Sequence, residues 1–152
     1  MKLSVRGEYA LRALIVLGET YEQGIIRIQT ISDRQNIPKR FLEQILNDLR
    51  SGGFVESRRG VAGGYRLARV PEEITLAALI HYIQGALPLT PLTGTRHSPR
   101  GHRDEAASAI RSVMKEVRDA MHAVLEQITL ADLCERTRKL RGDASGNLDY
   151  MI

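Results

Sequence analysis

Basic and amide side chains gather on one stretch in the first half of the chain. Lys39, Arg40, Glu43 and Gln44 share the polar side of a predicted helix. Arginine and lysine can donate to guanine, glutamine can pair with adenine, and glutamate can accept from cytosine. These residue types suit contacts with base edges in a DNA groove, although a solvated helix face would carry the same types.

Two adjacent arginines, Arg58 and Arg59, stand at the tip of a predicted hairpin, beside Gly60, Gly63 and Gly64. Arginine enters a narrow minor groove well, because the negative potential is strongest there. Glycine permits positive φ and lets the backbone approach phosphates closely. An ordinary hairpin turn explains the glycines but not the paired arginines, so we predict DNA contact at this tip.

The start of the chain offers a weaker set of contacts. Lys2 and Arg6 are basic, and Ser4 can cap a first helix. The N-terminus of a helix attracts phosphate, because its first N–H groups are free. We therefore add Lys2 and Ser4 to the predicted DNA-binding residues.

Other reactive side chains receive an ordinary structural interpretation. His97 and His102 lie five residues apart before Asp104 and Glu105, and such a set is able to bind zinc or iron. Their stretch is rich in glycine and proline, so we favour a plain loop and assign no metal. Cys134 is the single cysteine, which excludes an internal disulfide and fits a reducing cytosol. A buried inert thiol is favoured over a redox role, which needs a lowered pKa.

The elements that must position these residues follow the order of a winged helix-turn-helix. A first helix begins at Ser4 and fades near Gly24, residues 25–28 form a short strand, and residues 30–35 form a second helix. A turn at residues 36–38 follows, because the residue before a proline avoids the helical region.

The third helix carries the polar face described above. Pro38 suits its first position, where a missing N–H costs nothing. Gly52 and Gly53 end it, because glycine accepts the left-handed conformation common at helix ends. Short strands around residues 54–55 and 65–67 then form the wing. Helical spacing gives this helix one apolar stripe, made of Leu42, Ile45, Leu46 and Leu49.

One capping element occurs twice, as ITLAAL at residues 74–79 and as ITLADL at residues 128–133. In the first copy Thr75 is the expected N-cap, with a hydrophobic staple between Ile74 and Leu79. We interpret the pair as one capping solution used twice, not as an internal domain repeat.

A long helix is predicted from residue 104 to residue 127. Apolar residues recur along it with spacings of 4, 3, 4, 3 and 4, which is the pattern of a coiled-coil seam. Packing on the chain's own core would explain such a stripe, but a dimer interface is preferred because a winged helix needs a second copy to reach two half-sites. The predicted dimer interface consists of Ile110, Met114, Val117, Met121, Val124 and Ile128.

The expected fold class is mostly α with a small β-wing: a winged helix-turn-helix plus a long dimerisation helix. We divide the chain into a DNA-binding domain at 1–83, a flexible loop at 84–103, the dimerisation helix and a C-terminal helix at 104–141, and a tail at 142–152. The last helix is expected to span residues 130–140.

Charge and composition agree with a DNA-binding first half. Of the net charge of +4, residues 1–70 carry +5 (12 basic, 7 acidic) and residues 71–152 carry −1 (10 basic, 11 acidic). An excess of positive charge favours an anionic partner. The chain is 43% hydrophobic, yet no run reaches the roughly 18 apolar residues of a membrane helix. We expect a cytoplasmic protein without a signal peptide or membrane contact.

Three segments together resemble the IscR-like (Rrf-two) family of bacterial transcription regulators. They are MKLSVRGEYALRAL, ISDRQNIPKRFLEQIL and VESRRGVAGGYRLAR, and the resemblance is strong over residues 1–83. It implies a dimeric winged-helix protein that binds imperfect palindromes in DNA, with the long helices crossing at the dimer interface. The resemblance also implies that some members carry an iron–sulfur cluster held by three cysteines in the loop before the dimerisation helix, and that in IscR itself a histidine just beyond the third cysteine completes the ligands.

The chain departs from the cluster-binding members. In an ungapped match Leu92, Ser98 and Asp104 stand at the three cysteine positions, and Ala107 at the histidine position. Clusters depend on thiolates as their main ligands, so we predict no cysteine-ligated cluster and no cofactor. Glu8 occupies a position where some cluster-binding relatives place a carboxylate ligand, and a surface salt bridge is the favoured interpretation here.

The sequence therefore predicts a DNA-binding transcriptional regulator, most simply a repressor, that acts as a homodimer on a palindromic operator. A partner protein or a small metabolite is the expected source of control, as the resemblance suggests for cluster-free members. The alternative is a protein-interaction module that uses the same fold. We find no paired nucleophile and base and no phosphate-binding loop, so an enzyme is not expected.

Overall fold

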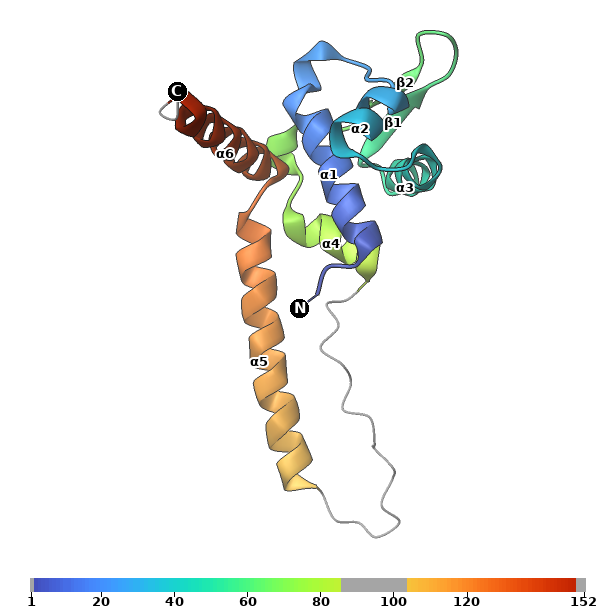
Figure 1. Ribbon diagram of the computed structural model, residues 1–152. Helices are drawn as coiled ribbons and strands as arrows, with labels where there is room; N and C mark the ends of the chain where they lie inside the picture. Colours follow the sequence, from blue (N-terminus) through green and yellow to red (C-terminus); the bar gives the residue numbers. More distant parts are fainter. Residues whose placement is uncertain (1, 86–103, 150–152) are drawn as a thin grey trace.

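A central helix, α1, organises the first part of the chain, and the other elements of that part surround it (Figure 1). The computed structural model describes residues 2–85 and 104–149. Within them the fold is mostly helical with one two-stranded antiparallel sheet, so the expected fold class is confirmed. The elements are α1 (Val5–Glu19), η1 (Tyr21–Gln23), α2 (Ile28–Gln35), α3 (Lys39–Ser51), β1 (Val55–Arg58), β2 (Gly64–Leu67), η2 (Pro71–Glu73), α4 (Leu76–Gln84), α5 (Glu105–Gln127) and α6 (Leu130–Asp149).

Helix α1 is set by a cap at its start and an apolar face along its length. The Gly7 N–H donates to Ser4 Oγ at 3.0 Å, so the predicted N-cap is confirmed. The helix ends at Thr20, whose hydroxyl donates to the Val16 carbonyl at 2.7 Å. Its buried face forms the middle of the core, through Ala10, Ala13, Leu14, Val16 and Leu17.

The turn between α2 and α3 differs slightly from expectation. Asn36 adopts the left-handed conformation at φ 51°, and Ser32 donates to the Ile37 carbonyl at 2.6 Å. Pro38 is the N-cap of α3, not its first helical residue as predicted, because its extended ψ of 128° continues the turn. The predicted apolar stripe is buried throughout, and Gly53 at φ 76° follows the end of the helix as expected.

The predicted strand at residues 25–28 is wrong in extent. Only Ile26 pairs there, by two 2.8 Å hydrogen bonds with Tyr65, and α2 already begins at Ile28. The wing itself is a regular hairpin in which Val55 lies opposite Leu67 and Arg58 lies opposite Gly64. The Ile26 bridge thus fixes the base of the wing to the segment before α2.

The two ITLA elements meet in space. Thr75 and Thr129 form an antiparallel bridge, with the Leu76 N–H donating to Ile128 and the Leu130 N–H donating to Ile74, each at 2.8 Å. Thr75 caps α4 through the Ala78 N–H at 3.2 Å, as predicted. The repeated sequence therefore both caps α4 and α6 and pairs the two helix starts with each other.

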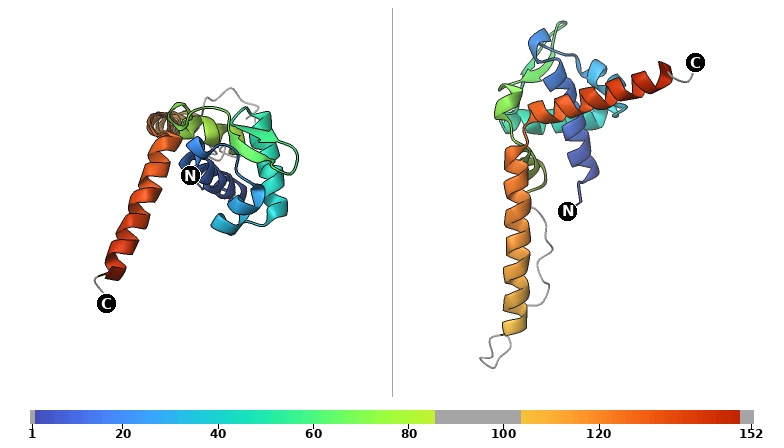
Figure 2. Two further views of the ribbon diagram at one scale, coloured as in Figure 1. Left: turned by 90° about the horizontal axis from the view of Figure 1, so that it is seen from above. Right: turned by 90° about the vertical axis from the view of Figure 1, so that its left-hand side faces the viewer.

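Helix α5 extends away from the first part of the chain as a long arm, and α6 leaves it in a different direction (Figure 2). The arm begins at an Asp104 cap and has no buried residue in this single chain. Helix α6 packs on α1 near Leu130 and Cys134, both buried.

The predicted end of the last helix at residue 140 is wrong. Helix α6 continues to Asp149. Gly142 lies within this helix, and a glycine within a helix costs only about 1 kcal/mol and does not forbid the next turn. The division of the chain into four units stays a prediction.

Across the described residues, no helix has the length and apolar character needed to cross a bilayer.

Candidate nucleic-acid interface

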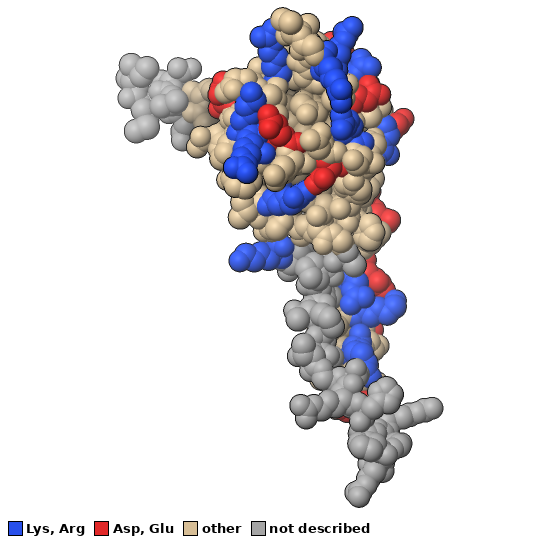
Figure 3. All heavy atoms as spheres, turned by 90° about the vertical axis from the view of Figure 1, so that its right-hand side faces the viewer, with Lys and Arg blue, Asp and Glu red and all other residues tan. Residues whose placement is uncertain are grey.

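An open groove of about 590 Å³ separates the wing from the N-terminal ends of α2 and α3 and the wing-facing side of α3. Its lining contains five cationic side chains and no carboxylate, so its electrostatic potential suits a polyanion. Figure 3 shows the side of the molecule on which α3 lies, where basic side chains are spread over the surface with acidic side chains among them. The cations of the groove are Arg27, Lys39, Arg50, Arg58 and Arg59.

The predicted residues of α3 divide between the groove and the outer surface. Lys39 lines the groove, together with Asn47 two turns later. Arg40, Glu43 and Gln44 are exposed on the same helix and lie outside that lining. An α-helix presents such an exposed polar face to the major groove when it binds DNA, so all four stay predicted base or phosphate contacts.

The tip of the wing is a tight turn that depends on its glycines. The Gly63 N–H donates to the Gly60 carbonyl at 3.0 Å, and Gly60 has φ 107°. A Cβ on Gly63 would lie 2.3 Å from the Arg58 carbonyl oxygen. The Val61 side chain at the tip is 96% exposed.

Gly64 has a packing role at the base of the wing. A Cβ there would lie 2.2 Å from the Ile26 carbonyl oxygen, which accepts the bridge hydrogen bond from Tyr65. Gly60, Gly63 and Gly64 thus have structural reasons to be glycine, and their contact with DNA stays a prediction.

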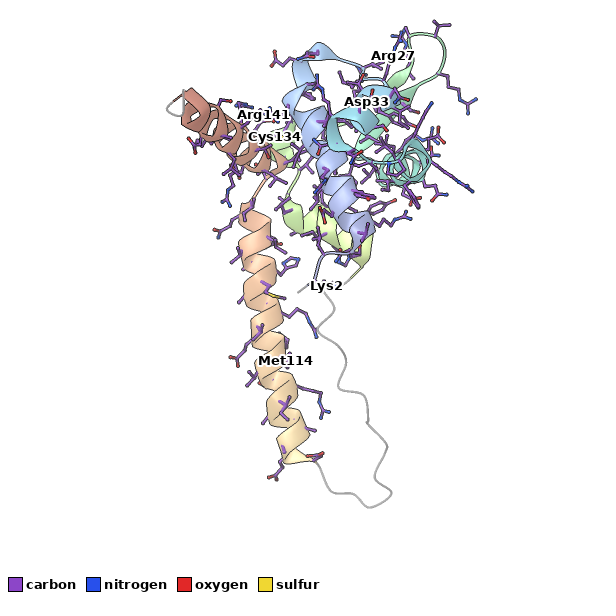
Figure 4. The ribbon with its side chains drawn as sticks, in the orientation of Figure 1. Lys2, Arg27, Asp33, Met114, Cys134 and Arg141 are labelled. Atoms are coloured by element: carbon purple, nitrogen blue, oxygen red, sulfur yellow. The ribbon has the colours of Figure 1, made fainter. Side chains whose placement is uncertain are left out.

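Several polar residues of the groove are absent from the predicted site, among them Arg27, Asn47 and Arg50. Arg27 lies before α2 and donates to the Val61 carbonyl at 3.4 Å, beneath the wing tip (Figure 4). Arg50 donates to Ser57 Oγ at 3.0 Å and so links α3 to β1. Asn47 and Arg50 follow Lys39 by 8 and 11 residues, which is the helical spacing of one face. That spacing alone was a signal for Asn47 and Arg50, whereas nothing local marks Arg27.

The N-terminal candidates are held by contacts within the chain. Ser4 Oγ accepts from Gly7 and donates to Gln84 Oε1 at 3.1 Å. Lys2 is exposed. Arg6 forms an ion pair with Asp48 of α3. The DNA contacts of Lys2 and Ser4 stay predictions, and a contact by Arg6 would compete with its ion pair.

Two further residues behave as the sequence suggested. Glu8 pairs with Arg12 at 2.6 Å, which confirms the salt-bridge interpretation. Cys134 is 2% exposed between α6 and α1 (Figure 4), and a Cβ on Gly18 would lie 2.6 Å from its sulfur. Burial, reinforced by the charge of Glu19, raises the pKa of the Cys134 thiol to about 11. A thiol with a raised pKa is a poor nucleophile. His97 and His102 lie outside the described residues.

Five of the six predicted dimer residues form an apolar stripe on the arm, whereas the sixth, Ile128, follows the end of α5 and packs against the chain's own core. Ile110, Val117 and Val124 are 49%, 43% and 60% exposed in the single chain, and Val113 beside them is 57% exposed. Met114, on the same stripe, lies in the middle of the arm (Figure 4) and is half-buried. A stripe of this kind is unusual on a surface that stays in water.

The winged hairpin, the exposed polar face of α3 and the basic groove between them define a winged helix-turn-helix DNA-binding protein. The Rrf2 family model, described as an iron-dependent transcriptional regulator, matches residues 3–136. The chain belongs to the Rrf2 family of transcriptional regulators.

Named relatives agree with this assignment. The HTH-type transcriptional regulator CymR of Bacillus subtilis is 32% identical over 137 residues, which cover 90% of this chain and 92% of CymR. The HTH-type transcriptional regulator IscR of Aliivibrio salmonicida is 29% identical, over 88% of this chain and 77% of IscR.

Solved structures give the same result for the fold. The structure of CymR, the global cysteine regulator of B. subtilis, matches with a TM-score of 0.73 at 31% identity, over 90% of this chain and 98% of that one. The structure of T. potens IscR matches with a TM-score of 0.70 at 31% identity, over 90% of this chain and 88% of that one.

The family description names iron, but the residues of this chain do not fit a thiolate-held iron–sulfur cluster. A cluster needs several cysteine thiolates, and the sequence contains one cysteine. That cysteine is buried against α1, with its sulfur 3.6 Å from the Ile15 carbonyl oxygen. No role for a cluster follows from these residues.

Proposed function

We propose that this regulator acts as a homodimer that binds an imperfect palindrome in the cytoplasm and represses transcription without an iron–sulfur cluster. The observation that carries the DNA-binding part is the groove beside α3, with five cations and no carboxylate in its lining. Arg58 and Arg59 at the wing would enter a flanking minor groove, while Arg40 and Gln44 of α3 would meet base edges in the major groove.

The exposed stripe of α5 supports the dimer. A long helix whose apolar side chains are about half exposed gains free energy when it covers them, at roughly 25 cal/mol for each Å² removed from water. The 4-3 spacing of that stripe matches the spacing of paired helices. A second copy would thus bring a second α3, and two such helices bind half-sites about one DNA turn apart.

Repression follows from position. A dimer that occupies a promoter excludes RNA polymerase from the same duplex, and no catalytic step is required. Control would come from a partner protein or a small metabolite, since the chain lacks the cysteines with which cluster-binding relatives hold iron.

The experiment that tests the dimer places a charge inside the stripe. Val117→Glu puts a carboxylate in the middle of the proposed interface, whereas the matched control Ser112→Glu puts the same group on the opposite face of α5. We expect sedimentation velocity to give a monomer for Val117→Glu and a dimer for the control. A dimer in both variants would refute the interface.

The same two variants test whether tight binding to the operator requires the dimer. A duplex selected by the chain from a random-sequence library should be bound tightly by the control and weakly by Val117→Glu. Binding of a scrambled duplex as tightly as the selected one would refute sequence-specific regulation and favour the interaction module.

A further inference from the structure

Helix α4 contacts the helices α1 and α3, and it also contacts the junction between α5 and α6. Its start pairs with that junction through the Thr75–Thr129 bridge. Its last turn contacts α3 through Tyr82 and the start of α1 through Gln84. The helix therefore links the base of the arm to the DNA-binding helix by named contacts at both of its ends.

Tyr82 is fitted closely to the C-terminal end of α3. Its hydroxyl donates to the Asp48 carbonyl at 2.7 Å. A Cβ on Gly52 would lie 2.5 to 2.8 Å from the ring, so this position must be glycine for the ring to sit there. The ring also makes an edge contact with Phe54, at 5.4 Å between centroids.

The neighbouring contacts hold the same corner of the molecule. Asp48 is paired with Arg6 of α1. Gln84 Oε1 accepts from the Ser4 N–H at 2.7 Å and from the Ser4 hydroxyl at 3.1 Å. These contacts together join the start of α1, Asp48 of α3 and the last turn of α4.

We propose that Tyr82 is a positioning residue for operator recognition, because it fixes the C-terminal half of α3 against α4. The proposal rests on DNA binding by α3 and requires no particular oligomer.

The physical reason is the position on α3 of the carbonyl that accepts the hydrogen bond from Tyr82. Asp48, which supplies this carbonyl, directly follows Asn47 and lies two residues before Arg50. The side chains of Asn47 and Arg50 both line the groove. Hydrogen bonds to bases require donor–acceptor distances within a few tenths of an ångström. A shift of the last turns of α3 would therefore weaken contacts with the correct bases more than nonspecific attraction to phosphates.

The first test removes only the hydroxyl. Tyr82→Phe keeps the ring, and Tyr21→Phe removes a hydroxyl from an exposed tyrosine on η1 as the control. Binding is measured to a duplex selected by the wild-type chain and to a scrambled duplex of equal length, well below the melting temperature. We expect Tyr82→Phe to lower the ratio of the two affinities by two- to about fivefold, the upper value matching about 1 kcal/mol for a lost hydrogen bond.

The second test uses the fit between Gly52 and the ring. Gly52→Ala should displace the ring and lower the same ratio, whereas Gly52→Ala in a Tyr82→Ala background should add no further loss. Gly142→Ala, where nothing lies within 4 Å of the new Cβ, is the control.

The outcomes separate positioning from simple stabilisation. A role confined to stability would lower the melting temperature of Tyr82→Phe and leave the affinity ratio unchanged, and that result would overturn the proposal. An equal loss from Gly52→Ala in both backgrounds would also overturn it. A lowered ratio with an unchanged salt dependence, together with non-additive loss at Gly52 and Tyr82, would support it.

Discussion

Removal of the wing arginine is the sharpest test of the basic groove. Arg59 lines the groove at the wing tip, and the Arg59→Ala variant deletes one cation without touching a buried side chain. The expected result is a weaker affinity for the operator together with a shallower dependence on salt, because each neutralised phosphate releases counterions.

The size of the effect follows from the lining. Five cations in each protomer give about ten in a dimer, and each phosphate contact contributes about 0.9 to the slope of log K against log salt. The wild-type slope should therefore approach about −9. Loss of Arg59 from both protomers should bring it to about −7. Between about 50 and 200 mM salt, the affinity of the variant should fall roughly tenfold less than that of the wild type.

The assay is fluorescence anisotropy with a labelled operator duplex, titrated at four or more salt concentrations. Arg138→Ala is the matched control, since it removes the same charge from an exposed site on α6, away from the groove. Equal slopes for Arg59→Ala and wild type, or an equal change in the Arg138→Ala control, would refute the assignment of the groove.

Three further predictions concern stability. Gly64→Ala should lower the free energy of unfolding by about 1 to 3 kcal/mol in urea titrations, because its Cβ would overlap the Ile26 carbonyl; an unchanged midpoint would contradict the packing described at the base of the wing. Thr129→Ala should cost about 1 kcal/mol by loss of the α6 cap, in which Thr129 Oγ1 accepts from the Asp132 N–H at 3.1 Å; calorimetry would measure it, and Thr137→Ala is a control at a half-exposed site within the same helix. Burial raises the pKa of the Cys134 thiol from its ordinary 9.0 to about 11 in the folded chain, so the stability that this thiol contributes is fully present below pH 9 and is lost as pH rises through 11. As pH rises from 9 to 11, the free energy of unfolding of the wild type should fall by about 2 to 3 kcal/mol more than that of Cys134→Ala. Identical pH profiles for the two proteins would contradict this prediction.

Short-range patterns predicted much of the fold. The stripe from Leu42 to Leu49 is buried as its spacing required, and Ser4 and Thr75 cap helices as their types suggested. Caps and amphipathic faces depend on residues within one or two turns, so the sequence contains the whole cause. The same applies to the resemblance of residues 1–83 to a winged helix-turn-helix, which depends on local segments in order.

The predictions failed where the deciding contacts are distant in sequence or where a local rule is weak. Residues 25–28 do not form a strand, because only Ile26 finds a partner in the wing. Helix α6 does not end at residue 140, because a single glycine such as Gly142 only weakens a helix.

The sequence by itself determined the class of protein, through helical periodicity, caps and the order of its segments. Only the tertiary structure decided which cations share one groove, since it brings Arg27 from before α2 beneath the wing and beside Lys39. It likewise decided that the two ITLA elements pair and that Tyr82 holds α3. The physical reason is that the contacts of Arg27 with Val61, of Tyr82 with Asp48 and of Thr75 with Thr129 join residues 34 to 54 positions apart, for which no local pattern exists.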